Sequence, residues 1–194
     1  MNFIAHRINT IKELKEIPSQ FGVEIDVRDY NNKLVIQHDP FVNGEDFEEY
    51  LSQYKNGTLI LNIKSERIEY KVLELVKKYN IDDYFLLDSS FPMIYELSRK
   101  GEKKIALRFS EFESIETIIN LKGKIDWVWV DCFSKLPIDI NIFKRLKLHN
   151  FKLCLVSPEL QGQEEKIIQY KNYLNNNKII FDAICTKIYN VDKW

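Results

Sequence analysis

The stretch GVEIDVRDYNNKLVIQHDP, residues 22–40, places two carboxylates two positions apart inside an apolar run and ends that stretch with a His-Asp pair. Alternate side chains of a strand share one face, so Glu24 and Asp26 point the same way. Two carboxylates near His38 could hold a cation beside a group that transfers protons. Either carboxylate taken alone is explained equally well by a structural ion pair, so the rest of the chain must decide.

Polar residues also stand late in several other apolar runs. A single buried ion pair does not explain polar residues at the ends of six predicted strands. Carboxylate and amide oxygens suit a hard divalent cation, whereas Arg and Lys side chains suit the oxygens of a phosphate. The set therefore predicts a site for a phosphate and a cation, made of His6, Arg7, Glu24, Asp26, Asn62, Lys64, Arg108, Asp131 and Lys187.

The elements that must position these residues alternate between apolar runs and amphipathic stretches. Strand-helix alternation repeated eight times is typical of parallel sheet with crossover helices, and eight units favour a closed (β/α)8 TIM barrel. With about 24 residues for each unit, the barrel is compact and some helices are short or missing. No linker interrupts residues 1–194, so we expect one domain. The strands are predicted at residues 3–6, 23–27, 58–64, 84–90, 104–110, 127–132, 151–157 and 181–187, with a returning piece at 34–38.

A period of two separates the strand side chains that face the helices from those that face the barrel interior. In the second strand the two valines and the isoleucine face the helices, which leaves Glu24 and Asp26 facing inward. Trp127 and Trp129 also face inward and are expected to form wall or core, although Trp129, with Asp131, could line a substrate pocket. The polar inward residues fall late in their strands, at the end of a barrel where active sites form.

The helix signals are weaker than the strand signals. Residues 65–80 form an amphipathic segment for which Ser65 is the expected N-cap. Asp88 and Ser89 could cap the next helix, and Gly101 is a suitable residue to follow its end. These three positions are therefore interpreted as helix boundaries.

Composition limits the classes of partner. A hydrophobic content of 45%, with 29% charged residues and a net charge of −1, indicates a globular protein without the basic field that nucleic acids or anionic membranes need. No apolar run approaches the roughly 20 residues that span a bilayer, and His6-Arg7 interrupts the place of a signal peptide. Three unpaired cysteines favour buried thiols in a reducing compartment. We expect a cytoplasmic protein with a small-molecule partner, no nucleic acid and no stable membrane anchor.

The order of short motifs resembles the glycerophosphodiester phosphodiesterase family, within the wider group of phospholipase-C-like phosphodiesterases. The family's first strand ends in His-Arg, its second carries Glu-x-Asp, a short return leads to His-Asp, and its third strand ends in a Lys motif. A Ser-Phe signature and a last strand closing with Thr follow. The similar segments here are AHR (5–7), VEIDVR (23–28), KLVIQHDP (33–40), LNIK (61–64), DSSF (88–91) and ICTK (184–187). They cover the whole chain and are densest in residues 4–64.

The resemblance implies an activity and assigns roles. His6 and His38 would be general acid and base, in either order, of a hydrolase that cleaves a small soluble phosphodiester. Glu24 and Asp26, with Asn62, would hold Mg²⁺ or Ca²⁺. Oxygens of the phosphate would be bound by Arg7 and Lys64, and the further cations predicted at the mouth are Arg108 and Lys187.

Two departures from the family pattern bear on this function. Asn62 stands where the family usually has a third metal carboxylate, so affinity for the cation is expected to be lower. Lys187 replaces the family's Asp after the closing Thr, which favours a more anionic substrate. Two alternatives therefore stay open: a metal-independent cleavage by intramolecular attack, and a barrel that binds a phosphorylated ligand without turnover.

Overall fold

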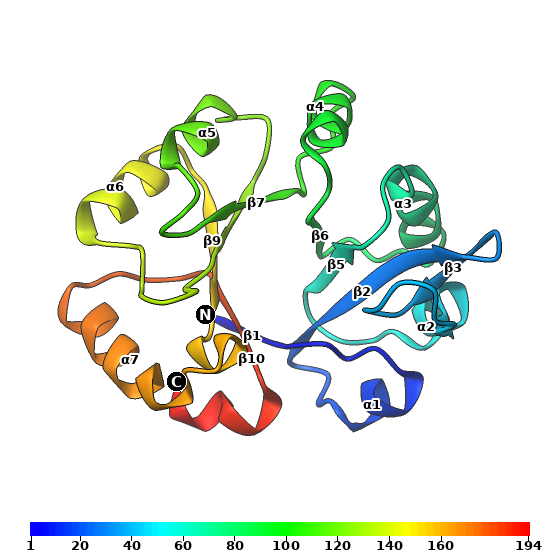
Figure 1. The fold of residues 1–194 in the computed structure, drawn as a ribbon, viewed down its shortest axis with the longest axis horizontal. Helices are drawn as coiled ribbons and strands as arrows, with labels where there is room; N and C mark the ends of the chain where they lie inside the picture. Colours follow the sequence, from blue (N-terminus) through cyan, green and yellow to red (C-terminus); the bar gives the residue numbers. More distant parts are fainter.

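A closed ring of parallel strands forms the centre of the computed structural model, which describes all of residues 1–194 (Figure 1). Around the ring the order is β1, β2, β5, β6, β7, β8, β9 and β10, and β10 pairs with β1. The predicted TIM barrel is confirmed. Its strands are β1 (Asn2–Ala5), β2 (Gly22–Tyr30), β5 (Leu59–Ile63), β6 (Tyr84–Leu87), β7 (Ala106–Phe109), β8 (Trp127–Val130), β9 (Lys152–Val156) and β10 (Ala183–Thr186).

Closure of the ring is uneven. β1 and β10 share four register pairs, from Asn2 with Ala183 to Ala5 with Thr186. β6 and β7, in contrast, are joined only by one isolated bridge between Leu86 and Ile105, just before β7 begins. Beyond that bridge the two strands separate, so the wall of the barrel has a seam at β6–β7.

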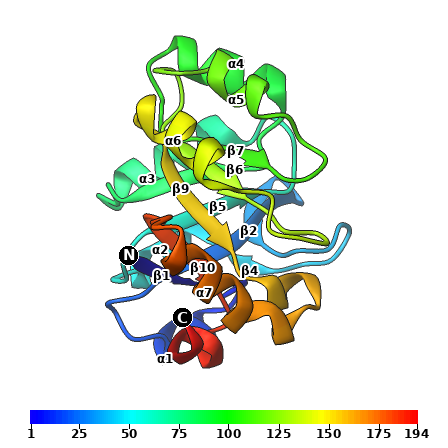
Figure 2. The same cartoon turned by 90° about the vertical axis from the view of Figure 1, so that its left-hand side faces the viewer.

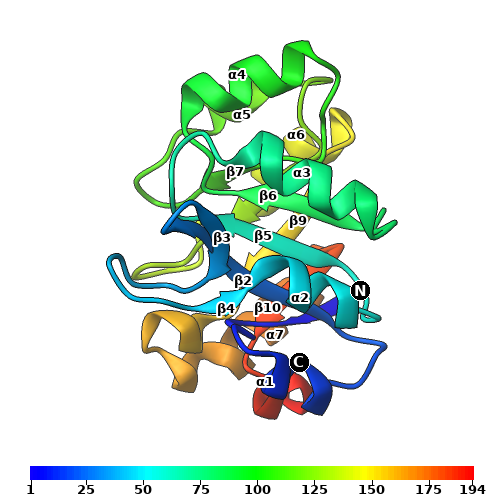
Figure 3. The ribbon, with the colours of Figure 1, turned by 90° about the vertical axis from the view of Figure 1, so that its right-hand side faces the viewer.

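Helices cover the outside of the ring, with α5, α6 and α7 on one side and α1, α2 and α3 on the other (Figures 2 and 3). Two of them, α1 and α5, have only six residues, as the short chain predicts, and a 3-10 segment, η3, follows β10. The helices are α1 (Ile11–Glu16), α2 (Phe47–Gln53), α3 (Glu69–Lys78), α4 (Phe91–Arg99), α5 (Ile115–Asn120), α6 (Ile140–Leu148) and α7 (Ile167–Asn176), with η1 (Pro158–Gln161), η2 (Glu164–Lys166) and η3 (Ile188–Lys193).

The helix boundaries follow the sequence signals only in part. Gly101, with φ of 93°, follows the end of α4 as predicted. The prediction for Ser65 is wrong: α3 begins at Glu69, and the Ser65 hydroxyl instead accepts a hydrogen bond from the Asp29 backbone N–H. The N-cap of α4 is Ser90, which leaves Asp88 free for another role. Side chains near a strand end can therefore be drawn into the site rather than into a cap.

A hairpin extends β2 beyond the barrel and returns the chain to the mouth. β2 pairs antiparallel with β3 (Lys33–Ile36), from Val27 with Ile36 outward, and β3 pairs with the short β4 (Glu45–Asp46). Asn31 and Asn32 both have positive φ, 47° and 62°, as a two-residue hairpin turn of type I′ requires. The hairpin thereby carries the segment after β3 back to the end of β2.

Two separate apolar clusters form the core. The larger cluster lies between strands and helices and includes Val23, Ile25 and Val27. The smaller one fills the barrel interior and includes Trp127 and Trp129. The inward and outward sets predicted from the period of two are confirmed for these strands. The interior is therefore apolar along most of its length and polar at the carboxyl ends.

Candidate active site

Glu24 and Asn62 form the buried floor of the site, on the neighbouring strands β2 and β5. The Asn62 side-chain amide donates a hydrogen bond of 2.8 Å to Glu24 Oε1, and the Arg7 backbone N–H donates one of 2.8 Å to Oε2. Glu24 is 1% exposed. Burial, and then the neighbouring charge of Asp26, raise the pKa of Glu24 to about 7. The floor therefore carries a carboxylate whose charge is only partly compensated.

Asp26 is held by an amide side chain and two cations. The Asn9 side chain donates to Asp26 Oδ2 at 2.8 Å, and the Asp26 backbone N–H donates back to Asn9 Oδ1 at 3.0 Å. Arg7 Nε lies 3.7 Å from Oδ2 and Lys64 Nζ lies 3.4 Å from Oδ1. Asp26 is thus oriented from both sides, by the loop after β1 and by the end of β5.

His6 stands at the end of β1 with its ring near the buried carboxylate. Its Nε2 lies 3.8 Å from Glu24 Oε2, and its side chain is 17% exposed. Burial, followed by the positive charges of Lys187 and Arg7, lowers the pKa of His6 to about 3. His6 is therefore a neutral imidazole at pH 7, and its affinity for a proton stays low unless a negative charge in the cavity offsets the nearby cations.

His38 reaches the same mouth from the β2–β3 hairpin. Arg7 Nη2 lies 2.7 Å from His38 Nε2, and His38 Nδ1 lies 2.8 Å from Asp39 Oδ1. A guanidinium only donates hydrogen bonds, so Nε2 must accept and the proton sits on Nδ1, facing Asp39. Arg7 adopts a left-handed φ of 55°, a conformation that turns its side chain toward both Asp26 and His38.

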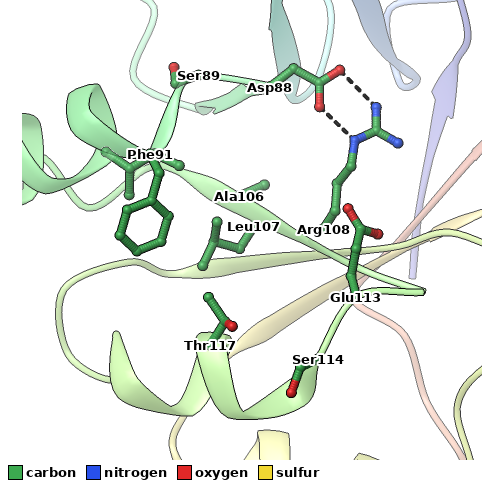
Figure 4. A pocket seen from close by; sticks show the side chains of 10 residues that line it. Asp88, Ser89, Phe91, Ala106, Leu107, Arg108, Glu113, Ser114 and Thr117 are labelled. Carbon is green, nitrogen blue, oxygen red and sulfur yellow. Dashed lines mark hydrogen bonds and ion pairs between the residues drawn. The ribbon is translucent and has the colours of Figure 1, made fainter. Parts of the chain in front are cut away.

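The remaining cations are paired with carboxylates of the next strands. Arg108 on β7 makes two hydrogen bonds to Asp88, of 2.6 and 2.7 Å (Figure 4). It donates a third, of 2.6 Å, to Asp131. Lys64 Nζ lies 3.6 Å from Asp88 Oδ2, without a hydrogen bond. Arg108 is thus engaged by protein carboxylates, whereas Lys64 keeps ammonium hydrogens for a ligand.

These residues surround a cavity of about 200 Å³ at the carboxyl ends of the strands. The Trp129 indole N–H at its wall is buried and has no hydrogen-bond partner. Neither His38 nor Lys187 lines the cavity: His38 contacts the lining residue Arg7, and the charge of Lys187 lowers the pKa of His6. The lining consists of His6, Arg7, Glu24, Asn62, Lys64, Arg108, Trp129, Asp131, Val156, Leu160 and Gln161.

Eight of the sequence-predicted residues line the cavity, whereas Asp26, His38 and Lys187 do not, and the supporting partners of the predicted residues were missed. Asn9 orients Asp26, and Gln161 donates a 2.8 Å hydrogen bond to Asp131 Oδ1. Asp88, interpreted as a helix cap, is the main partner of Arg108. Its place directly after β6 was the available signal. For Asn9, in a loop, and Gln161, at the end of η1, the sequence pattern carries no comparable signal.

Comparisons of fold give a consistent result. A glycerophosphodiester phosphodiesterase from Agrobacterium tumefaciens matches with a TM-score of 0.66 at 13% identity, over 95% of this chain and 96% of that chain. A phosphodiesterase from Oleispira antarctica, in complex with the product sn-glycerol-3-phosphate, matches with a TM-score of 0.65 at 18% identity, over 95% and 92%. The chain has the fold of the glycerophosphodiester phosphodiesterases. No family model matches the sequence, and no curated protein matches it significantly.

Whether the residues suit a divalent cation can be tested on the oxygens of the floor. The protein has no group of three His, Cys, Asp or Glu side chains placed to hold a metal ion, because Asn62 supplies the third position. Asp26 Oδ1 and Asn62 Oδ1 are, however, buried without a hydrogen-bond partner. Unpartnered oxygens beside a carboxylate of raised pKa fit a hard cation. Glu24, Asp26 and Asn62 therefore suit a divalent cation, although together they carry one negative charge fewer than three carboxylates.

None of the helices is both long and apolar enough to cross a membrane.

Proposed function

We propose that this protein is a phosphodiester hydrolase that cleaves a small, glycerophosphodiester-like substrate by histidine acid-base catalysis assisted by a divalent cation. The observation that carries the proposal is a cavity lined by His6, Arg7 and Lys64 beside a buried carboxylate pair, with His38 bonded to Arg7 at its edge. A pocket that only binds phosphate needs the cations but has no use for two imidazoles. The shared fold with phosphodiesterases supports the same conclusion.

Phosphate oxygens are bound by donors that lack a saturated protein partner. Lys64 makes only loose ion pairs, at 3.4 and 3.6 Å, and can turn its hydrogens to a ligand. The buried Trp129 N–H has no partner and gains one when a phosphate enters. Arg7 supplies the third donor group at the cavity. Arg108 has a positioning role instead, because its guanidinium holds Asp88 and Asp131 in place.

His6 is the base and His38 the acid. Neutral His6 takes the proton of the attacking hydroxyl, from water or from the substrate itself, as the new P–O bond forms. To act as the acid, His38 must carry a proton on Nε2, which requires that a bound phosphate takes over the Arg7 guanidinium now donating to that nitrogen, while Asp39 holds Nδ1–H. His38 then donates that proton to the leaving oxygen as its bond to phosphorus breaks.

Glu24, Asp26 and Asn62 would hold the divalent cation. Bound there, it supplies Lewis-acid polarisation of a phosphoryl oxygen. The unpartnered oxygens of Asp26 and Asn62 support this assignment. The pairing of Lys64 with Asp26 favours the alternative, a metal-independent cleavage in which protein cations alone balance the carboxylates. Activity in excess chelator distinguishes the two.

The proposal is tested by following phosphorus NMR spectra of the protein with glycerophosphodiesters and nucleotide-diphospho-alcohols, in Mg²⁺, Ca²⁺ or chelator. We expect a diester to be converted to a monoester or cyclic phosphate by the wild type and not by His38→Ala. His149→Ala is the matched control, because His149 is the C-cap of α6 and lies outside the site. Equal turnover by wild type and His38→Ala would exclude His38 from the mechanism, and no turnover of any diester by the wild type would favour a binding protein instead.

A further inference from the structure

A second and larger cavity lies beside the proposed phosphate site, in the seam between β6 and β7. Its volume is about 500 Å³, compared with about 200 Å³ for the phosphate cavity. Figure 4 shows its lining side chains, which come from the start of α4, from β7 and from the segment leading into α5. They are Asp88, Ser89, Phe91, Ile94, Ala106, Leu107, Arg108, Glu113, Ser114 and Thr117.

The cavity exists because the wall of the barrel is incomplete there. After the bridge between Leu86 and Ile105, β7 pairs only with β8. The edge of β7 that faces β6 therefore carries backbone N–H and C=O groups without a strand partner. Ala106, Leu107 and Arg108 line the cavity. The backbone groups of Leu107 face β8, so a ligand in the seam meets the backbone of Ala106 and Arg108 on the edge without a strand partner.

Arg108 separates the two cavities and lines both of them. On the seam side it is held by Asp88, whose carboxylate also lies 3.6 Å from Lys64 in the phosphate site. A phosphate bound at Lys64 thus lies one side chain away from the seam. A substituent on that phosphate would have to pass the Arg108–Asp88 pair to reach the seam cavity.

The lining combines an apolar face with unpartnered polar atoms. The Phe91 ring is about half exposed, and Leu107 and Ile94 lie on the same cavity. Ser89 is 8% exposed and its hydroxyl has no hydrogen-bond partner. One carboxylate oxygen of Glu113 is likewise buried without a partner. Such atoms gain free energy from a ligand that brings hydroxyl donors.

We infer that the seam cavity is the subsite for the alcohol of the phosphodiester, and that this alcohol carries a hydroxylated ring, a sugar or a cyclitol. A ring of this kind has an apolar C–H face for Phe91 and peripheral hydroxyls for Glu113, Ser89 and the β7 edge. A lipid chain would leave these polar atoms unpaired. A quaternary ammonium alcohol would lie on Phe91 by a cation–π contact, but it leaves the Ser89 hydroxyl without a partner and is small for the cavity. The inference rests on the proposed function for the position of the phosphate.

Binding is tested without turnover, by calorimetry with D-glucose 1-phosphate, glycerol 1-phosphate and inorganic phosphate. We expect the ring phosphate to bind about tenfold more tightly than the other two, a difference of about 1.4 kcal/mol. Phe91→Ala should remove that preference, and Glu113→Gln should reduce it. Tyr95→Ala is the matched control, because Tyr95 lies one turn further along α4, is exposed to the same degree and does not line the cavity.

Hydrolysis supplies the second measurement. With glycerophosphodiesters of a ring polyol and of glycerol, Phe91→Ala should raise KM for the ring substrate about tenfold and leave that for the glycerol substrate unchanged. Equal binding of the three phosphates, or a ring preference that survives in Phe91→Ala, overturns the subsite. A ring preference that depends on Phe91, without turnover of any diester, supports the subsite and contradicts the proposed hydrolase.

Discussion

Replacing Glu24 with glutamine is expected to stabilise the protein above pH 7 while weakening its binding of a cation. Glu24 is buried next to Asp26, and these two causes raise its pKa from 4.5 to about 7. A carboxyl whose pKa is higher in the folded state favours folding fully below pH 4.5, and this contribution is lost as the pH rises through 7. Glutamine carries no charge at any of these pH values and avoids the cost of the buried anion.

The magnitude follows from the shift and from one hydrogen bond. A pKa raised from 4.5 to about 7 corresponds to roughly 3 kcal/mol of lost stability at pH 8. The two Glu24 oxygens each accept one hydrogen bond, from Asn62 and from the Arg7 N–H. Glutamine has one acceptor oxygen and loses one of these two bonds, which costs about 1 kcal/mol of stability. The net gain at pH 8 is about 2 kcal/mol, or a rise in Tm of about 4–8 °C for a chain of this size.

Urea denaturation of wild type and Glu24→Gln at pH 5 and pH 8, in chelator, measures this effect. At pH 5 the variant should be equal to the wild type or less stable, because the wild-type carboxyl is then protonated. Glu66→Gln makes the same chemical change on an exposed side chain and should show no difference at either pH. A Glu24→Gln variant that is less stable than the wild type at pH 8, or a stability difference independent of pH, would refute the reasoning.

Three further predictions concern the same floor and mouth. Asn62→Asp adds a third carboxylate and should tighten binding of Mg²⁺ or Ca²⁺ about tenfold in calorimetry, so unchanged affinity would exclude Asn62 as a ligand. His38→Ala should lower kcat by about 10²–10⁴ in the phosphorus assay while phosphate binding persists, and loss of binding would make His38 structural. The pKa of His6 is lowered from 6.5 to about 3 in the folded protein, so the free energy of unfolding should fall as the pH falls below 6.5. In denaturation curves at pH 6.5 and pH 4, His6→Gln should lose less stability than the wild type. An equal loss of stability would contradict the burial of neutral His6.

The barrel and the inward position of the polar side chains at its mouth could be predicted because strand patterning has a simple period. Val23, Ile25 and Val27 alternate with Glu24 and Asp26, and a strand that buries one face against helices must present the other set to the interior. Carboxyl ends of parallel strands meet at one end of a closed ring, so residues far apart in the chain could be placed together before any contact was known.

The partners of those residues could not be predicted, because loop backbone decides where they point. Arg7 and Asp88 both have left-handed φ, 55° and 61°. Glycine is the usual sequence signal for this conformation, and neither position has one. With this backbone conformation, the Asp88 side chain accepts hydrogen bonds from Arg108 instead of capping α4. Ser65 binds the Asp29 backbone for a similar reason: capping residues serve whichever N–H group the fold brings near.

The seam in the wall has a consequence for the motion of the whole barrel. Since one bridge joins β6 to β7, while four register pairs join β1 to β10, separation at the seam breaks the fewest hydrogen bonds of any opening of the ring. The cylinder then becomes an open curved sheet with all of its other ladders intact. The amide of Leu86, which donates to Lys104, should therefore exchange its hydrogen for deuterium faster than the equally buried amides at the centre of β9. The weakest junction of the barrel wall therefore lies beside the proposed site.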